Sequence, residues 1–217
     1  MFKKLILAAL IVTSAAFAQV GVGGRAAANY GFWWGADAPD ELDGGLGFNA
    51  GVAVRVDILP MLSIVTGLEV DFRRVAGKEE DEDYDYYMGE EIRIKYSDEV
   101  SMNMWYLDVP VLARLNVIPM FHADLGVLLG LKLAANEHEE STASAMGRSE
   151  TRSKDTDFSK DCSSFDAGLV AGVGVSPIPG MLDVDFRFVL GLTTLDKDGH
   201  ASVKHMRMQL GATFWFM

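Results

Sequence analysis

The residues best suited to nucleophilic chemistry are His200 and Ser202, which stand two positions apart in the sequence GHAS at 199–202. On an extended strand, residues i and i+2 point to the same side, so the imidazole is placed to accept the serine proton during hydrolysis. A catalytic triad also needs a carboxylate that orients the imidazole, and the nearby sequence offers Asp196 or Asp198 for that role. A polar turn at the start of a strand explains the same residues, and we favour that interpretation.

Acidic and imidazole side chains elsewhere raise the questions of proteolysis and of metal binding. His138 lies in NEHEE at 136–140, where it has acids to pair with, but no loop motif of a protease accompanies it. The run DEDYDYY at 81–87 supplies the oxygen ligands that hard cations prefer, yet it lacks the ordered spacing and the glycine of a calcium loop. We expect this run to be disordered and solvated. The sequence therefore predicts no catalytic, cofactor-binding or metal-binding residues.

Several other candidates have a structural explanation. His122 and His205 fall on the polar side of predicted strands, where a hydrogen-bonded structural role is favoured over metal binding. Trp33 and Trp215 share that side and are expected to fill volume rather than bind a sugar. Met206 and Met208, which the alternation assigns to the opposite, lipid-facing side, need no cofactor to explain them.

The elements that position these residues are strands rather than helices. The segment 106–133 is long enough to cross a bilayer as one helix, but it contains five ionisable side chains and two prolines. One charge at the centre of such a helix costs roughly 2.5–3.5 kcal/mol on insertion scales. If the segment is instead an extended chain, in which alternate residues share a face, apolar residues fill one face both before and after Pro119. Polar residues fill the other face. The pattern predicts two strands joined by a tight turn.

The same pattern recurs along the chain. Pro60, Pro119 and Pro179 lie about 60 residues apart, and each separates two alternating runs. The predicted strands are 20–34, 45–57, 62–75, 103–116, 120–134, 164–176, 181–194 and 202–216. The longer connections are 35–44, 76–102, 135–163 and 195–201. Ile92, Ile94 and Tyr96 alternate within the second of these, so we expect a strand there that projects above the membrane. An even number of strands with alternating short and long connections predicts an all-β fold, an eight-stranded antiparallel up-and-down transmembrane β-barrel.

The N-terminus and the overall charge define the compartment. Residues 1–18 combine a basic start, an apolar core and the small-residue sequence AFA, which predicts a cleaved signal peptide and a mature barrel domain over 19–217. The net charge of −12 opposes binding to nucleic acid. The single cysteine, Cys162, excludes an internal disulfide. We expect an exported protein of the outer membrane.

The polar face of the strands is expected to point into the barrel. It is rich in glycine, which a solvent-facing sheet has little use for, whereas the interior of a narrow barrel needs small residues. Its charges are nearly balanced: Arg25, Arg55, Arg73, Arg114, Lys132, Arg187 and Arg207 against Asp57, Glu69, Asp71, Asp108, Asp124, Asp166, Asp183 and Asp185. The opposite face is apolar, with aromatic residues at the two ends of its strands, which is typical of a lipid-facing surface.

The stretch YLDVPVL at 106–112 resembles the YLEIPLLLK signature of the PorT-like outer-membrane beta-barrel domain family. The apolar turn that follows it, and GLVAGVGV at 168–175, are also similar to that family. The resemblance extends over the mature chain and implies an eight-stranded outer-membrane barrel. It implies no biochemical activity and brings no functional residues.

The function expected from the sequence is that of a non-enzymatic outer-membrane barrel with a side-chain-filled interior and acidic surface loops. Its role would be structural, or an interaction at the cell surface. The expected partners are outer-membrane lipid, the barrel-insertion machinery and an envelope or surface protein. Two alternatives remain open: a barrel hydrolase similar to a lipid deacylase, and a soluble periplasmic barrel that holds an apolar ligand.

Overall fold

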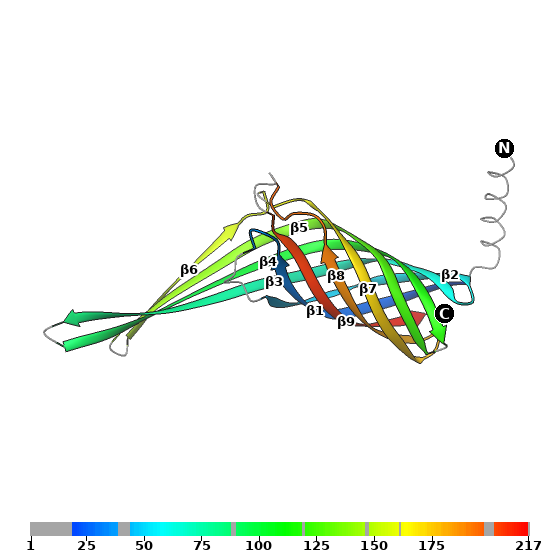
Figure 1. Cartoon of the computed structure of the whole chain (residues 1–217), viewed down its shortest axis with the longest axis horizontal. Coiled ribbons are helices and arrows are strands. Elements are labelled where there is room, and N and C mark those ends of the chain that lie inside the picture. The colour runs from blue at the N-terminus through cyan, green and yellow to red at the C-terminus, as the bar shows by residue number, and fades with distance from the viewer. Residues whose placement is uncertain are drawn as a thin grey trace.

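The structure is a computed structural model that describes residues 19–38, 44–87, 90–118, 120–145, 148–160, 162–197 and 202–216. The predicted signal peptide and Pro119 lie outside these residues. Within the described ranges the chain forms nine strands (Figure 1): β1 (Gln19–Trp34), β2 (Gly45–Leu59), β3 (Leu62–Tyr87), β4 (Glu90–Ile118), β5 (Phe121–Ala145), β6 (Arg148–Asp157), β7 (Phe165–Ile178), β8 (Leu182–Gly191) and β9 (Lys204–Phe216). No helix in these ranges is long and apolar enough to cross a membrane.

Eight of the strands close into a barrel. Each is antiparallel to its neighbours in the order β1, β2, β3, β4, β5, β7, β8, β9, and β9 pairs with β1 to complete the ring. The ring also depends on the pairing of β4 with β5, which runs from Ile118↔Phe121 to Ile94↔Ala145. All eight predicted strands are present, so the predicted barrel is confirmed.

The short connections follow from turn chemistry. At the end of β7 the backbone N–H of Met181 donates to the carbonyl O of Ile178 at 2.9 Å, which closes a four-residue turn. Pro179 stands at its second position and Gly180, with φ of +79°, at its third. A type II turn requires this left-handed φ, which glycine adopts without a steric penalty. The sequence PG therefore sets the direction of the chain between β7 and β8.

Strands β3, β4 and β5 continue far beyond the barrel. The strand expected at 92–96 is present as part of β4, but the rest of this extension was not predicted. Residues 76–102 and 135–163 were predicted to be long connections, and 81–87 to be disordered. Instead, β3 pairs with β4 out to Tyr87↔Glu90, and β5 pairs with β6 from Asn136↔Asp157 to Ala145↔Arg148. We call the four-stranded sheet formed by 76–87, 90–101, 136–145 and 148–157 the projecting sheet. Cross-strand pairing outweighs the low intrinsic β-propensity of its acidic residues.

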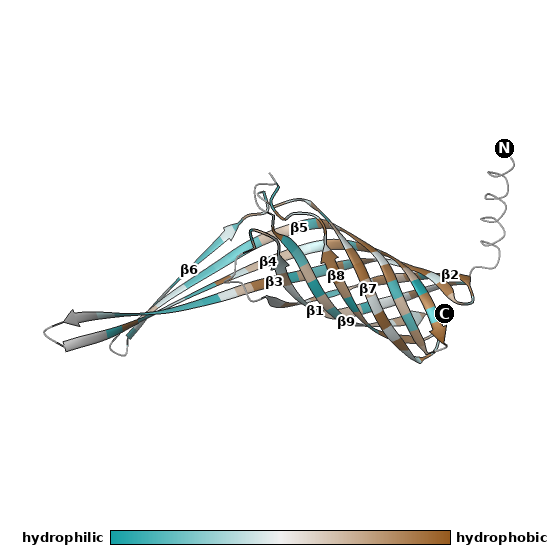
Figure 2. Cartoon of the chain, viewed as in Figure 1, coloured by the Kyte–Doolittle hydropathy of each residue, from teal (hydrophilic) through white to brown (hydrophobic). Residues whose placement is uncertain are grey.

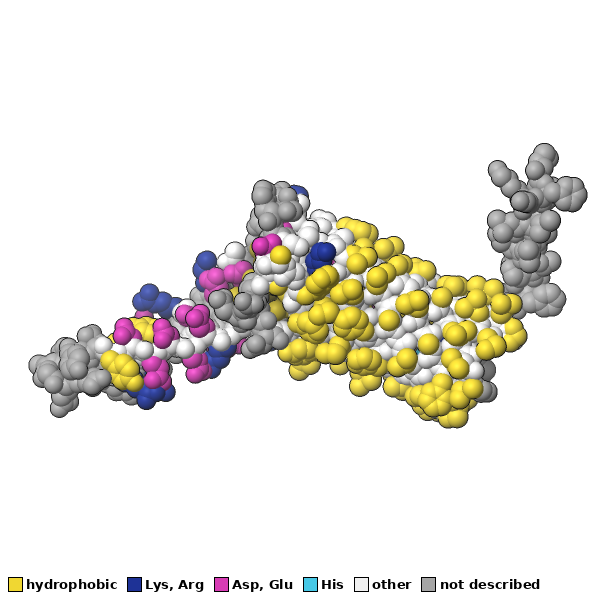
Figure 3. Space-filling view, viewed as in Figure 1, with side chains coloured by type: hydrophobic (Ala, Val, Ile, Leu, Met, Phe, Trp, Pro, Cys, Tyr) yellow, Lys and Arg dark blue, Asp and Glu magenta, His cyan; other side chains and the backbone are white. Residues whose placement is uncertain are grey.

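The two faces of the barrel wall differ as predicted. Leu125 on β5 is 67% exposed, whereas its neighbour Asp124 is 3% exposed and points inward. Hydropathy alternates along each strand of the barrel, and the projecting sheet is mostly hydrophilic (Figure 2). Hydrophobic side chains cover the visible outer surface of the barrel, and the charged side chains gather on the projecting sheet (Figure 3). The predicted sidedness is confirmed.

Aromatic rings on the outer face gather at both ends of the barrel. On the side of the long connections, the rings of Phe48, Phe72 and Trp105 lie 5.0–5.9 Å apart between centroids. On the side of the short turns, the rings of Phe214 and Phe216 lie 5.6 Å apart. Phe186 does not follow this pattern, because it is exposed near the middle of β8.

Candidate functional site

The upper half of the barrel interior is organised around Arg73, on the side of the projecting sheet. Its guanidinium binds Asp71 on the same strand at 2.8 Å, Asp108 on β4 at 2.9 Å and Asp166 on β7 at 2.5 Å. Arg207 on β9 also binds Asp71, and its Nη2 lies 3.5 Å from Asp108. Since β3 and β7 are not neighbours in the ring, the Arg73–Asp166 pair crosses the lumen.

A second ionic layer fills the lower half, toward the short turns. Arg25 on β1 binds Asp185 on β8 at 2.6 Å, and Arg187 lies 3.0 Å from the other oxygen of the same carboxylate. Arg114 on β4 binds Asp124 at 2.8 Å, and it reaches across the lumen to Asp183 on β8 at 2.5 Å. Buried charges of this kind are tolerated only when they are paired, because taking an ion out of water costs several kcal/mol.

Glycines on the inner face make room for these charges. A Cβ atom built on Gly130 would lie 2.6 Å from Oδ1 of Asp108, and one built on Gly211 would lie 2.6 Å from Nη2 of Arg25. Both distances are shorter than a carbon atom tolerates. A larger residue at either position would displace a side chain of the ionic network, so these glycines leave the ion pairs in place.

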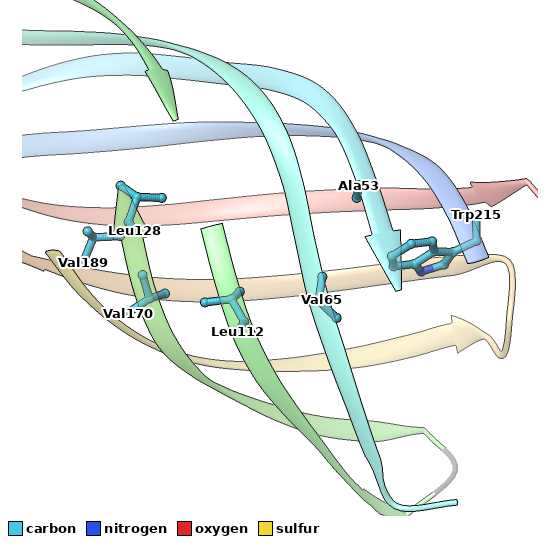
Figure 4. Packing of buried hydrophobic residues seen from close by; sticks show 7 residues of the cluster. All are labelled: Ala53, Val65, Leu112, Leu128, Val170, Val189 and Trp215. Carbon is cyan, nitrogen blue, oxygen red and sulfur yellow. The ribbon is translucent and has the colours of Figure 1, made fainter. Parts of the chain in front are cut away.

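An apolar cluster fills interior space next to the ionic groups. It is formed by inward-pointing side chains of seven strands (Figure 4): Ala53, Val65, Leu112, Leu128, Val170, Val189 and Trp215. Along β4, Leu112 lies between Arg114 and Asp108, so apolar and ionic side chains alternate within one strand. Trp215 fills volume as predicted, and its indole N–H donates to Oδ2 of Asp183 at 2.8 Å.

The outer mouth of the barrel is covered by a small apolar cap. Buried Met104, Tyr106 and Ala135 pack with Trp33, Phe158 and Leu195. Lys132 holds the connection that follows β6, because its ammonium donates to the carbonyl O of Ser159 at 2.6 Å and to that of Cys162 at 2.5 Å. The sequence placed Lys132 in the interior charge network, whereas the structure assigns it to this cap.

The inner mouth is more open. A pocket of about 650 Å³ is lined by residues of four of the strands and their turns, among them Arg55, Asp57, Asn116 and Ser176. The guanidinium of Arg55 lies over the ring of Trp215 at 4.8 Å, and its Nε is 3.3 Å from Asp57. Arg55 and Asp57 were predicted to face the interior, and they stand at its partly exposed lower end.

Of the residues considered for hydrolysis, the structure describes Ser202 and Asp196, which lie on neighbouring segments because the N–H of Leu195 donates to the carbonyl O of Val203 at 2.8 Å. His200 and Asp198 lie outside the described residues. The backbone N–H of Ser202 donates to Asp37 at 2.7 Å, and Asp196 forms a β-bridge with Cys162.

The histidines have other surroundings. His205 is buried beside Trp33 and Tyr106, with ring centroids 6.2 Å and 6.1 Å away, and His122 is buried at the lower end of β5. His138 contacts Asp155 on β6 at 2.6 Å, a pair that sequence reasoning missed because β6 itself was not predicted. In the described ranges no three His, Cys, Asp or Glu residues form a group that would hold a metal ion.

The barrel has known counterparts. A family model described as "Outer membrane protein beta-barrel domain" matches residues 17–197. Among solved structures, Ail, the attachment invasion locus protein of Yersinia pestis, was determined in complex with the heparin analogue sucrose octasulfate. It is 16% identical, the match covers 91% of this chain and 99% of that one, and the TM-score is 0.42.

Two further structures give similar values. Neisserial surface protein A is 13% identical over 92% of this chain and 99% of its own, with a TM-score of 0.46. A major outer membrane protein of Thermus thermophilus is 16% identical over 90% and 99%, with a TM-score of 0.40. A search of curated protein sequences found no match. Since the family model spans most of the chain, this protein belongs to the outer membrane protein beta-barrel domain family and resides in the outer membrane.

Proposed function

We propose that the protein is a non-enzymatic, non-conducting barrel that anchors the projecting sheet at the cell surface, where the sheet makes contacts with other molecules. The observation that carries this proposal is the difference between the two parts of the chain. The barrel interior is crossed by ion pairs such as Arg73–Asp166, whereas the projecting sheet is solvent-exposed and carries charged side chains. The barrel would hold the protein in the membrane, and the sheet would carry its interactions.

Absence of conduction is expected from the packing of the interior. Arg73, Arg114 and Arg207 are almost completely buried, and an eight-stranded barrel has only enough room for its own side chains. Planar-bilayer recordings of the purified protein should show no stable conductance, with a sixteen-stranded porin as positive control. Steps of porin-like size from this barrel would overturn this part of the proposal.

The domain assignment is part of the same proposal. Residues 1–18 would be removed as a signal peptide, and 19–217 would form a barrel domain of the PorT-like type. The support is the sequence YLDVPVL at 106–112, which lies on β4. N-terminal sequencing of the protein from outer membranes should begin at Gln19, and a longer N-terminus would contradict the assignment.

The role of the projecting sheet can be separated from that of the barrel by shortening both hairpins. Gly77 pairs with Val100, and Glu139 pairs with Lys154, so residues 78–99 and 140–153 can each be replaced by Asn-Gly, a two-residue hairpin turn. Heat-modifiable migration should persist, which would show a folded barrel. Adducts formed on intact cells by a membrane-impermeant cross-linker should disappear. Retention of all adducts would assign the contacts to the barrel and contradict the proposal.

The hydrolase alternative depends on His200, which lies outside the described residues. Ser202→Ala should leave any lipid-deacylation rate of the purified protein unchanged.

A polyanion such as the heparin analogue bound to Ail is a poor match for the surface of this protein, because the net charge of −12 repels it.

A further inference from the structure

The projecting sheet has two unpaired edges. Beyond the bridge between Gly44 and Ala76, the outer edge of β3 has no neighbouring strand in the part of the chain that the structure describes. At the other side of the sheet, β6 pairs with β5 alone. Unpaired edges expose backbone N–H and C=O groups that another strand can bind, and natural proteins usually protect them.

The direction of the backbone groups at each edge can be derived from two hydrogen bonds. The N–H of Ala76 donates to Gly44 O at 3.3 Å, so the even-numbered residues of β3 turn their backbone groups outward. The N–H of Phe158 donates to Ala135 O at 3.2 Å, so the even-numbered residues of β6 face β5 and the odd-numbered ones face outward. A new pairing between the two edges must therefore match even residues of β3 with odd residues of β6.

The membrane determines the relative direction of neighbouring copies. All copies of an outer-membrane barrel are inserted with the same orientation, so β3 runs away from the membrane and β6 runs toward it in each of them. Two copies side by side thus present β3 and β6 to one another as antiparallel strands. Two like edges would instead run parallel, and two β3 edges would also place acid against acid.

The charges of the two edges match in one register. With Glu80 opposite Ser153, the backbone phase is satisfied, Glu79 lies opposite Lys154, and Asp81 lies opposite Arg152. In the described structure neither Glu79 nor Asp81 has an ion pair with a Lys or Arg side chain of its own copy. Asp83 opposite Glu150 is the one like-charged pair in this stretch. Within its own copy Arg152 lies 2.9 Å from Glu150 and Lys154 lies 3.7 Å from Glu139, both at the exposed surface, so each cation would be shared with an acid of the next copy.

We propose that the projecting sheet is an interaction surface for a second copy of this chain, in which β3 of one protomer pairs with β6 of the next. The proposal rests on the proposed function only in requiring that the sheet stand outside the membrane. The two surfaces are different, so the contact is heterologous and leaves one β3 edge and one β6 edge free. Copies can therefore join into open chains, and the contact begins at residue 78, beyond the barrel wall.

Disulfide trapping on intact cells tests the register directly. In a Cys162→Ser background, cells would produce one copy with Glu80→Cys and a second, tagged copy with Ser153→Cys. Directly opposed residues of an antiparallel pair have Cα atoms about 5.5 Å apart, within the range of a disulfide. We expect a reducible dimer that contains both copies, and a ladder of larger species from a single chain carrying both substitutions.

Controls separate a specific contact from collision. Each cysteine variant alone, and Glu80→Cys with Ser149→Cys, should give at least tenfold less dimer. Arg152→Glu with Lys154→Glu in the second copy should abolish the dimer, and Glu79→Lys with Asp81→Lys in the first copy should restore it.

Equal dimer yields from the single cysteine variants, or no dimer from the matched pair, would overturn the inference. If the sheet is labelled on intact cells while no dimer forms, the proposed function still stands; if the sheet is not accessible, both fail.

Discussion

Arg73 on β3 and Asp166 on β7 bind one another across the lumen of the barrel, with 2.5 Å between Nη1 and Oδ2. The two residues are separated by three strand-to-strand steps around the ring, from β3 through β4 and β5 to β7. Asp71 and Asp108 bind the same guanidinium, and the ring of Tyr106 lies 3.7 Å from its central carbon. One cation therefore holds carboxylates from three strands in position.

Removing this cation should destabilise the barrel strongly. Arg73→Ala leaves three buried carboxylates without their shared partner, and breaking a buried pair from one side costs about 3–5 kcal/mol. Urea unfolding in lipid vesicles, followed by heat-modifiable migration, measures the free energy of unfolding. Arg152→Ala on the exposed strand β6 is the matched control and should change it by less than about 1 kcal/mol. Similar values for the two variants would contradict the role of Arg73.

A side chain at Gly126 should also be costly. A Cβ atom there would overlap the backbone O of Val111 and the Cα of Leu112 on β4, and backbone atoms cannot move away as the end of a side chain can. We expect Gly126→Ala to destabilise the barrel by about 1–3 kcal/mol, the usual cost of overpacking. Gly24→Ala is the control, since a Cβ there meets only the ring of Phe216 at an ordinary 3.6 Å. Equal stability of the two variants would show that the inner face has spare room.

The attachment of β6 should depend on pH. The pKa of His138 is raised because its ring is hydrogen-bonded to Asp155 on β6, with Glu140 and Glu99 adding to the effect. A raised pKa in the folded state means that the pairing is fully stabilised below the unfolded value of about 6.5 and loses this contribution as the pH rises through the folded pKa. Hydrogen exchange should therefore show the even-numbered amides of 150–156, which face β5, better protected at pH 5.5 than at pH 8, after correction for the intrinsic rate. His138→Gln should remove the difference, and a persistent difference would assign it to another group.

Much of the barrel could be predicted from the sequence because its signals are local. Period-two alternation, the prolines of the turns and the glycine-rich polar face are each visible within a few residues, and together they define the eight strands and their sidedness. The strand β6 gave no such signal. Its sequence RSETRSKDTD has neither alternation nor β-branched apolar residues, and it forms a strand because β5 offers a partner across the hairpin.

Specific partners in the interior could not be predicted for a different reason. Alternation assigns Arg73 and Asp166 to the same face of the sheet, but it does not say which strands face each other across the lumen. Lys132 shows the same limit, because its partners are carbonyl groups of a connection whose path depends on the closed barrel. Phe186 was overlooked because the expectation of two aromatic belts left no place for a ring in the middle of a strand.

The central claim is that the apolar outer wall faces hydrocarbon, and site-directed spin labelling tests it most directly. Labels would be placed at Leu125, Val173 and Leu210, which point outward from β5, β7 and β9, and at Glu80 on the projecting sheet. In lipid bilayers the three wall sites should be accessible to oxygen and shielded from a water-soluble nickel reagent, with the reverse at Glu80. Exposure of the wall sites to the nickel reagent in folded, membrane-bound protein would contradict the account.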